Sequence, residues 1–317
     1  RVLNGEPSVR PGTAGRVMEA VRRLGFQKNE AAAALRRGTR VEAPVVGLVV
    51  ADPTDAAAWR LARGAGEAGW ERGACLLVTS SQDNAGVEAD VVRLLVGRGI
   101  DGLLLVPTEA DHSFLDAVLD DGPPLVFLGR PASGFEADTV VAADADAARR
   151  AVDLLLDRGH RRIAFVAAVD HGRTVRERRR GYTCALAERG VPFDAALVHV
   201  GGPATTLDEG LAAVLAAPRP PTAILCADHD STVAVLRAVR VVPADPPAVA
   251  CFDDVELADL LDPSMTVVAP AATALGRTAA ELLFRRIDGD RRPAQHVSLQ
   301  PVLIPGGHVP LRPDPLP

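Results

Sequence analysis

The sequence is poor in cysteine, with four among its 317 residues and no CxxC pair. Cys75, Cys184, Cys226 and Cys251 stand far apart, a spacing that disfavours both a zinc site and a disulfide framework. Scattered single cysteines are typical of a reducing compartment. We therefore expect a cytoplasmic protein that holds no metal and needs no cofactor.

Long hydrophobic runs are also missing. No apolar run approaches the ~20 residues that cross a bilayer, and no basic segment followed by an apolar one opens the chain. We expect neither a membrane partner nor export. The composition, 48% hydrophobic and 24% charged, is globular, and the length exceeds one ordinary core, which predicts two domains or subdomains.

The common catalytic motifs are absent too: there is no GxSxG elbow, no Walker phosphate loop and no HExxH. The string GAGEAG at 64–69 falls inside an expected helix, which disfavours a phosphate loop. His160 follows a helix and has a structural role in our interpretation. Asp253 and Asp254 follow a strand, but no third metal ligand accompanies them. We expect no enzyme.

What the sequence does contain is a basic head. Residues 1–40 carry nine Arg or Lys against three Glu, a net charge of +6, which leaves −12 for the rest of a chain whose total is −6. Such a head either meets a polyanion or is a solvated helical arm, and composition leaves both open. Apolar spacing predicts a helix over 11–24, ended by Gly25, and a second short helix over 29–38.

From Val45 onward, strands and helices alternate with a short period. A first series of strands (45–51, 74–81, 101–107, 124–129) is interleaved with helices (61–68, 86–99, 112–122). A second series follows, with helices at 145–160, 175–190, 207–217 and 230–239 and strands at 161–168, 196–200, 222–228 and 248–254. This pattern predicts an α/β protein with two Rossmann-like lobes, whose ligand lies outside the carboxyl ends of the strands.

Eight segments in order carry a family pattern: RVLNG through LGF over 1–26, LARGAGEAG from Leu61, IDGLLLVP from Ile100, RGHRRIAFV from Arg158, RRRGYTCAL from Arg178, PPTAILCADHD from Pro220, FDDVELADLLDPSMTVV from Phe252 and ALGRTAAELL from Ala274. Each segment alone is weak, but their order and spacing are specific. Over nearly its whole length the chain resembles the lac repressor (LacI) family of transcriptional regulators.

The resemblance implies a fold in which two lobes of the periplasmic-binding-protein type follow an all-α DNA-binding head. It places the head and hinge helix at 1–40, the N-terminal lobe at 44–142 plus 270–292, and the C-terminal lobe at 143–269 plus 293–310. The lobes would be joined by crossovers near Ala142 and Ala269. The implied partners are operator DNA, a second copy of the chain in a homodimer, and a small-molecule effector.

The resemblance also implies DNA contacts in the head. Arg1 to Asn4 would be the end of a recognition helix, most of whose helix-turn-helix the given chain lacks. Leu35 would be the apolar wedge that a hinge helix inserts between base pairs; the alternative is that it packs on the core. The family often carries an arginine two residues earlier, where this chain has Ala33, and Arg36 and Arg37 would substitute for it.

For the effector, the resemblance assigns Arg178 to the cleft, with a surface charge as the alternative. Asp144 would accept hydroxyls from a sugar, or instead cap a helix. The family's Asn-Asp pair is replaced here by Asp228-His229, which puts His229 at the ligand position. The remaining effector candidates are Asp52, Asp55 and Asp253.

The family's aromatic pair in the first lobe is replaced by Ala57 and Ala58. Trp59 faces either the cleft or the core, and the core is favoured. With only 3% aromatic residues, a sugar or polyol is favoured over a stacked nucleobase. The function predicted is a ligand-responsive DNA-binding regulator, expected to be a repressor. The alternative is a periplasmic-type solute-binding protein, against which the basic head argues.

Overall fold

The computed structural model describes residues 2, 11–24, 43–54, 56–120, 122–168, 172–201, 207–240, 246–252, 265–269 and 271–306. It divides into two compact units, residues 1–44 and 45–317. In the first unit the predicted head helix is confirmed as α1 (Pro11–Arg23), with Arg22 and Arg23 in its last turn, where positive charge stabilises the helix dipole. The predicted hinge helix over 29–38 lies outside the described residues.

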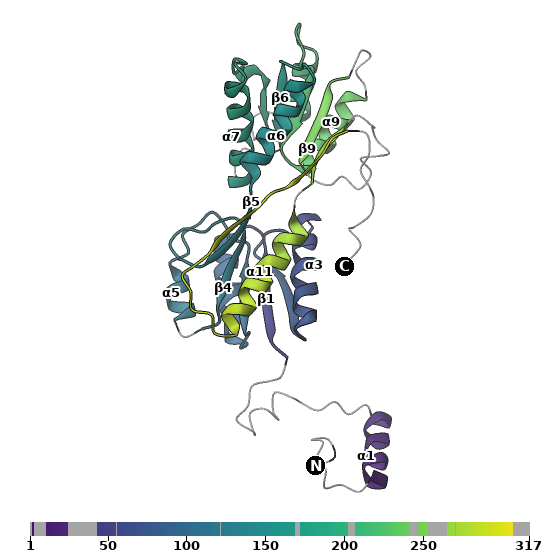
Figure 1. The fold of residues 1–317 in the computed structure, drawn as a ribbon, viewed down its shortest axis with the longest axis vertical. Helices are drawn as coiled ribbons and strands as arrows, with labels where there is room; N and C mark the ends of the chain where they lie inside the picture. The colour runs from purple at the N-terminus through teal and green to yellow at the C-terminus, as the bar shows by residue number, and fades with distance from the viewer. Residues whose placement is uncertain are drawn as a thin grey trace. The chain divides into compact units, whose positions relative to one another are not determined.

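The first lobe of the second unit is built on a parallel sheet of six strands in the order β11-β5-β4-β3-β1-β2 (Figure 1). The strands are β1 (Val45–Val50), β2 (Cys75–Ser80), β3 (Gly102–Leu105), β4 (Leu125–Gly129), β5 (Asp138–Ala142) and β11 (His296–Leu299). Apolar residues of β1 face both ways: Leu48 packs with α3 (Ala56–Glu71) and α11 (Ala272–Ile287), and Val49 with α4 (Ala85–Gly97) and α5 (Phe114–Leu119). Burial on both faces explains the continuous apolar run.

The GAGEAG string lies inside α3, as predicted. A Cβ atom on Gly64 would lie 1.9 Å from the carbonyl oxygen of Thr273, and one on Gly276 of α11 would lie 2.0 Å from that of Leu61. Glycine at both positions therefore lets the backbones of α3 and α11 touch, which explains the string without a phosphate.

The second lobe repeats the design with the order β12-β10-β9-β8-β6-β7, parallel except for β12. Its strands are β6 (Ile163–Ala167), β7 (Val198–Val200), β8 (Ala223–Cys226), β9 (Ala248–Phe252), β10 (Thr266–Ala269) and β12 (Val302–Ile304). One face is covered by α6 (Asp144–Asp157) and α7 (Arg173–Glu188), the other by η2 (Ala195–Leu197), α8 (Leu207–Leu215) and α9 (His229–Val239). The two predicted Rossmann-like lobes are confirmed.

The chain passes between the lobes three times, after β5, after β10 and between β11 and β12 (Figure 1). The expectation that 293–310 belongs to the C-terminal lobe is wrong in its first part, because β11 pairs with β5 of the first sheet. Residues 286 and 295 are fastened to the first lobe because the carboxylate of Asp138 accepts hydrogen bonds from the Arg286 guanidinium and from the Gln295 N–H, each at 2.7 Å. The third crossing therefore lies at residues 300–301.

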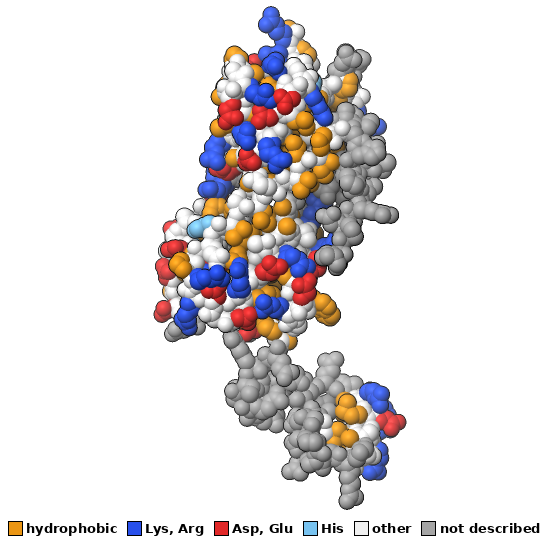
Figure 2. All heavy atoms as spheres, viewed as in Figure 1, with side chains coloured by type: hydrophobic (Ala, Val, Ile, Leu, Met, Phe, Trp, Pro, Cys, Tyr) orange, Lys and Arg blue, Asp and Glu red, His pale blue; other side chains and the backbone are white. Residues whose placement is uncertain are grey.

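Charged side chains of both signs are interspersed over the face of the core drawn in Figure 2, with hydrophobic patches between them. No helix in the described ranges is both long and apolar enough to cross a membrane.

Candidate functional site

A cavity of about 400 Å³ lies where the carboxyl ends of the strands of both lobes meet. This interlobe cavity is lined from the first lobe by residues that follow β1, β3 and β4 and by the start of α3, and from the second by the first turns of α7 and by residues that follow β8. Its size and its position at the strand ends suit a small ligand, as the alternating pattern predicts.

Arg178 of α7 is buried in the wall of this cavity, 8% exposed. Its Nε donates to Asp144 Oδ1 at 2.8 Å, its Nη1 donates to the carbonyl oxygen of Ala227 at 2.6 Å, and the guanidinium lies 4.0 Å from the ring centroid of Phe252. The alternative of a surface charge is therefore wrong. A guanidinium has five N–H groups, so this fastened side chain keeps donors for a ligand.

Asp144 is the first residue of α6, and it too is buried. The residue in the N-cap position is Ala143, so Asp144 is not the helix cap that the sequence left as an alternative. Its position in the first turn favours a negative charge, because the helix dipole is positive there. The structure thus brings two predicted effector residues together, with Asp144 orienting Arg178.

Asp52 also lines the interlobe cavity, directly after β1. The backbone N–H and then the hydroxyl of Thr54 donate to its carboxylate, and these bonds lower the pKa of Asp52. The side chain is exposed and keeps acceptor capacity toward the cavity.

The sequence interpretation selected His229, but the residue that lines the cavity is its neighbour Asp228. Asp228 is the N-cap of α9: one carboxylate oxygen accepts from the Ser231 N–H at 2.7 Å and the other from the Ala168 N–H at 2.8 Å. His229 is exposed and is not among the described lining residues. The Asp-x-x-Ser spacing, which marks a helix start, was the signal that could have placed Asp228 at the strand end.

The other predicted site residues lie elsewhere. Asp55 and Asp253 fall outside the described residues, as do the proposed DNA contacts Arg1, Asn4, Leu35, Arg36 and Arg37. Trp59 is 64% exposed, so its expected place in the core is wrong. Ala58, Leu61 and Ala65 form the buried face of α3, and Trp59 lies on the opposite, solvent side of that helix.

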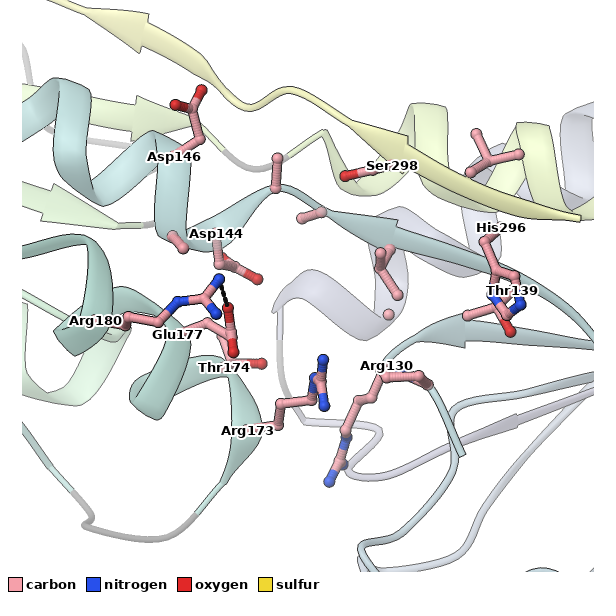
Figure 3. Close-up of a pocket in the computed structure, with 17 residues that line it drawn as sticks. Arg130, Thr139, Asp144, Asp146, Arg173, Thr174, Glu177, Arg180, His296 and Ser298 are labelled. Carbon is pink, nitrogen blue, oxygen red and sulfur yellow. Dashed lines mark ion pairs between the residues drawn. The ribbon is translucent and has the colours of Figure 1, made fainter. Parts of the chain in front are cut away.

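Two arginines that the sequence analysis did not select join the site. Arg130 follows β4 directly, after Gly129 with a left-handed φ of 78°, and its Nη2 donates to Asp83 Oδ1 at 2.9 Å. Arg173 begins α7. Both line the interlobe cavity and a second cavity of about 430 Å³ beside β5 and β11, and in Figure 3 their side chains extend into the same space from opposite lobes.

An ion pair joins the lobes near the cavity opening. Arg176 of α7 donates to the carboxylate of Glu109, which follows β3, with an Nη2–Oε1 distance of 2.9 Å. Both side chains are about half exposed. This pair holds α7 against the first lobe in the arrangement observed.

His160 accords with the structural role assigned to it. Its Nδ1 lies 3.1 Å from the hydroxyl of Thr222, and burial followed by the positive charge of Arg158 lowers the pKa of the imidazole. Over the described ranges, no group of three or more His, Cys, Asp or Glu side chains has a geometry that would hold a metal ion.

The chain is similar to known proteins over most of its length. Residues 152–307 match the model of a periplasmic binding protein-like domain. The HTH-type transcriptional regulator CelR of Thermobifida fusca is 33% identical over 306 residues, 92% of this chain and 87% of CelR. The HTH-type transcriptional repressor CytR of Escherichia coli is 28% identical over 94% of this chain and 86% of CytR. The structure of a transcriptional regulator CelR–cellobiose complex superposes with a TM-score of 0.71, at 28% identity, over 97% of this chain and 94% of that one.

Proposed function

The chain belongs to the lac repressor (LacI) family of transcriptional regulators, and on that premise we propose that a sugar or polyol bound between its lobes controls its binding to operator DNA. The relatives are regulators and not enzymes. We further propose that this chain acts as a repressor, in line with the activity that the name of CytR states for that protein.

The observation that carries the proposal is the fastened Arg178 in a cavity lined by both lobes. Sugar hydroxyls both donate and accept hydrogen bonds, and the cavity offers guanidinium donors beside the carboxylates of Asp52 and Asp228. No described residue of its lining is aromatic, which argues against a stacked nucleobase. The cellobiose complex of the similar regulator supports a sugar.

A ligand that touches both lobes changes their relative orientation only through its different affinity for each arrangement. The three crossing segments are short enough to act as hinges. In the proposed mechanism the lobe angle sets the spacing of two hinge helices in a homodimer. Leu35 would be the wedge in the minor groove, and Arg1, Asn4, Arg36 and Arg37 would contact DNA.

We propose the outer edge of the first sheet as part of the homodimer interface. Strand β2 is the edge strand, and its Leu77 and Val78 are 41% and 44% exposed. Leu94 of α4, the helix that follows β2 in the chain, is 55% exposed. An exposed strand edge with apolar side chains is suited to burial against a second copy of the chain.

The test uses fluorescence anisotropy with duplexes that tile the promoter region beside the gene. We expect the full-length form of the protein to bind one duplex over its scrambled version and to be released by a sugar from a panel that includes cellobiose. The Arg178→Gln variant should bind the same duplex without responding to the sugar, while Arg150→Gln, an exposed change on α6, should behave as wild type. Sugar binding without any preference among the duplexes would contradict the regulator and favour a solute-binding protein.

A further inference from the structure

A third cavity, of about 400 Å³, opens beside the interlobe cavity and is bounded by both lobes. The described residues that line this mouth cavity include three arginines, Arg130 from the first lobe and Arg173 and Arg176 from the second, and one carboxylate, that of Glu109. We propose that it binds an anionic group, a phosphate or a carboxylate, carried by the effector. The proposal rests on the proposed function and names the class of effector: a sugar phosphate or a sugar acid.

The charges in the mouth cavity do not balance. Arg176 is paired with Glu109, and Arg130 uses one nitrogen on Asp83. Arg173 has neither an ion pair nor a side-chain hydrogen bond to any residue that the structure describes. Among the described residues, one cation therefore has no partner of opposite charge beside two others.

The geometry brings these cations together only when the lobes face each other as they do here. Arg130 is held by the turn at Gly129 and its side chain is only 17% exposed, so it points into the cleft and not into solvent. Arg173 approaches from α7 of the opposite lobe, and Figure 3 shows the two side chains converging. The two guanidinium groups repel each other in this position. An anion bound between them would be attracted to both, and this attraction would offset the repulsion. A guanidinium also matches the oxygens of phosphate or carboxylate in shape.

The backbone N–H groups at the start of α7 add further hydrogen-bond donors for an anion. Arg173 starts a helix of 16 residues whose N-cap, Gly172, has no side chain to accept from the first-turn N–H groups. The positive end of the helix dipole therefore lies beside the arginines and favours an anion. Thr108 and Ser133 also line the cavity, but their hydroxyls already donate to Glu88 Oε1 and to the carbonyl oxygen of Ala110.

The mouth cavity is continuous in its lining with the interlobe cavity, because Arg130 and Arg173 line both. A single ligand can thus place a polyhydroxylated body against Arg178 and its anionic group between Arg130 and Arg173. Since those two arginines belong to different lobes, the anion would bridge the lobes beside the Arg176–Glu109 pair and stabilise the lobe arrangement observed here.

The first test isolates the anion. Thermal unfolding of the full chain is measured in inorganic phosphate and in chloride at equal ionic strength, and the difference between the two salts is read within each protein, so a change in folding stability cancels. We expect phosphate to raise the Tm of wild type and of Arg150→Gln, and this rise to be lost in Arg130→Gln and in Arg173→Gln. Equal Tm values in both salts for wild type, or an undiminished rise in both cavity variants, would overturn the anion site.

The second test asks which class of sugar carries the anionic group. It uses calorimetric titration of glucose, glucose 6-phosphate and glucuronate. An anionic member should bind about ten- to a hundredfold more tightly than glucose, because hydrogen bonds to charged groups are the strong ones. That advantage should vanish in Arg173→Gln, whereas Arg178→Gln should weaken all members alike. The relative order of the phosphate and the carboxylate distinguishes the two anions.

Failure of the two proposals can be told apart. If neutral and anionic sugars bind equally and depend on Arg178, the anion site is overturned and the proposed function stands. If inorganic phosphate acts through Arg130 and Arg173 while no titrated sugar depends on Arg178, the anion site stands and the proposed sugar effector is overturned.

Discussion

Among the described residues, each lobe has one arginine–aspartate pair in which both side chains are at most 14% exposed, and the two pairs have different roles. In the first lobe Arg286 makes two bonds of 2.7 Å to Asp138, through Nε and Nη2. Its Nη1, and Nη2 a second time, donate to carbonyl groups of the loop after α11. In the second lobe Arg178 makes one bond to Asp144 and one to a carbonyl oxygen, and it borders a cavity. Burial and charge are common to both pairs. The Arg178–Asp144 pair, which we propose to bind the ligand, differs in that Arg178 keeps N–H donors that face the interlobe cavity.

The first pair should contribute to stability without contributing to ligand binding. Asp138→Asn leaves the guanidinium of Arg286, 14% exposed, beside a neutral group, and breaking such a pair by changing one partner costs up to about 3–5 kcal/mol of unfolding free energy. Urea denaturation measures this loss, and ligand affinity at low temperature should stay at the wild-type value. A loss of affinity with unchanged stability would reverse the roles that we assign to the two pairs.

The same variant should change the response to acid. Burial alone would raise the pKa of Asp138, but the hydrogen bonds from Arg286 and the Gln295 N–H outweigh it and lower the pKa below the ordinary 3.8. Because the folded-state pKa is depressed, this carboxylate stabilises the fold above pH 3.8 and loses its contribution as pH falls toward the folded value. Wild type should therefore lose more stability than Asp138→Asn when pH drops through this window.

The ion pair between the lobes offers a smaller test. Glu109→Gln removes an exposed partner of Arg176, so we expect a loss of about 0–1 kcal/mol of unfolding free energy and at most a roughly fivefold loss of affinity for a neutral sugar such as cellobiose. Both effects should fade at high ionic strength. Glu188→Gln, which removes an exposed partner of Arg149 within the second lobe, is the control and should leave affinity alone. An equal affinity loss in both variants would show that the Glu109 pair does not hold the cleft.

The smallest effect is expected at His229. The side chain is exposed and outside the described cavity lining, so His229→Gln should change ligand affinity by no more than about twofold, the range of ordinary surface changes. Titration at pH 5.5 and 7.5 checks this (two conditions chosen as about one unit either side of the ordinary histidine pKa). A tenfold loss of ligand affinity in His229→Gln at either pH would show that His229 contacts the ligand.

The sequence predicts those parts of the molecule whose reasons are local. The apolar run of β1 and the glycines of α3 follow from burial on two faces and from close helix packing, and both appear in the pattern of residues. The edge strands β11 and β12 carry no such pattern: their residues are mostly exposed or half-buried. The lobe to which β11 belongs depends instead on the distant Asp138.

The site divides in the same way. Arg178 and Asp144 could be selected from the family resemblance, and the structure places Arg178 Nε 2.8 Å from Asp144 Oδ1. Arg130 and Glu109 could not, because their partners and neighbours come from other segments: Asp83 lies 47 residues from Arg130, and Arg176 lies 67 residues from Glu109. Contacts between lobes depend on lobe orientation, which no local spacing encodes.

The central claim is that Arg178 binds the ligand, whereas the Arg286–Asp138 pair only stabilises the fold. The most direct test is calorimetric titration of one panel (glucose, cellobiose, glucose 6-phosphate and glucuronate) onto wild type, Arg178→Gln and Asp138→Asn, each confirmed as folded by circular dichroism. We predict that Arg178→Gln binds the best panel member about ten- to a hundredfold more weakly, the value of a hydrogen bond involving charge, while Asp138→Asn binds it as wild type does. Equal affinity of Arg178→Gln and wild type would contradict the account.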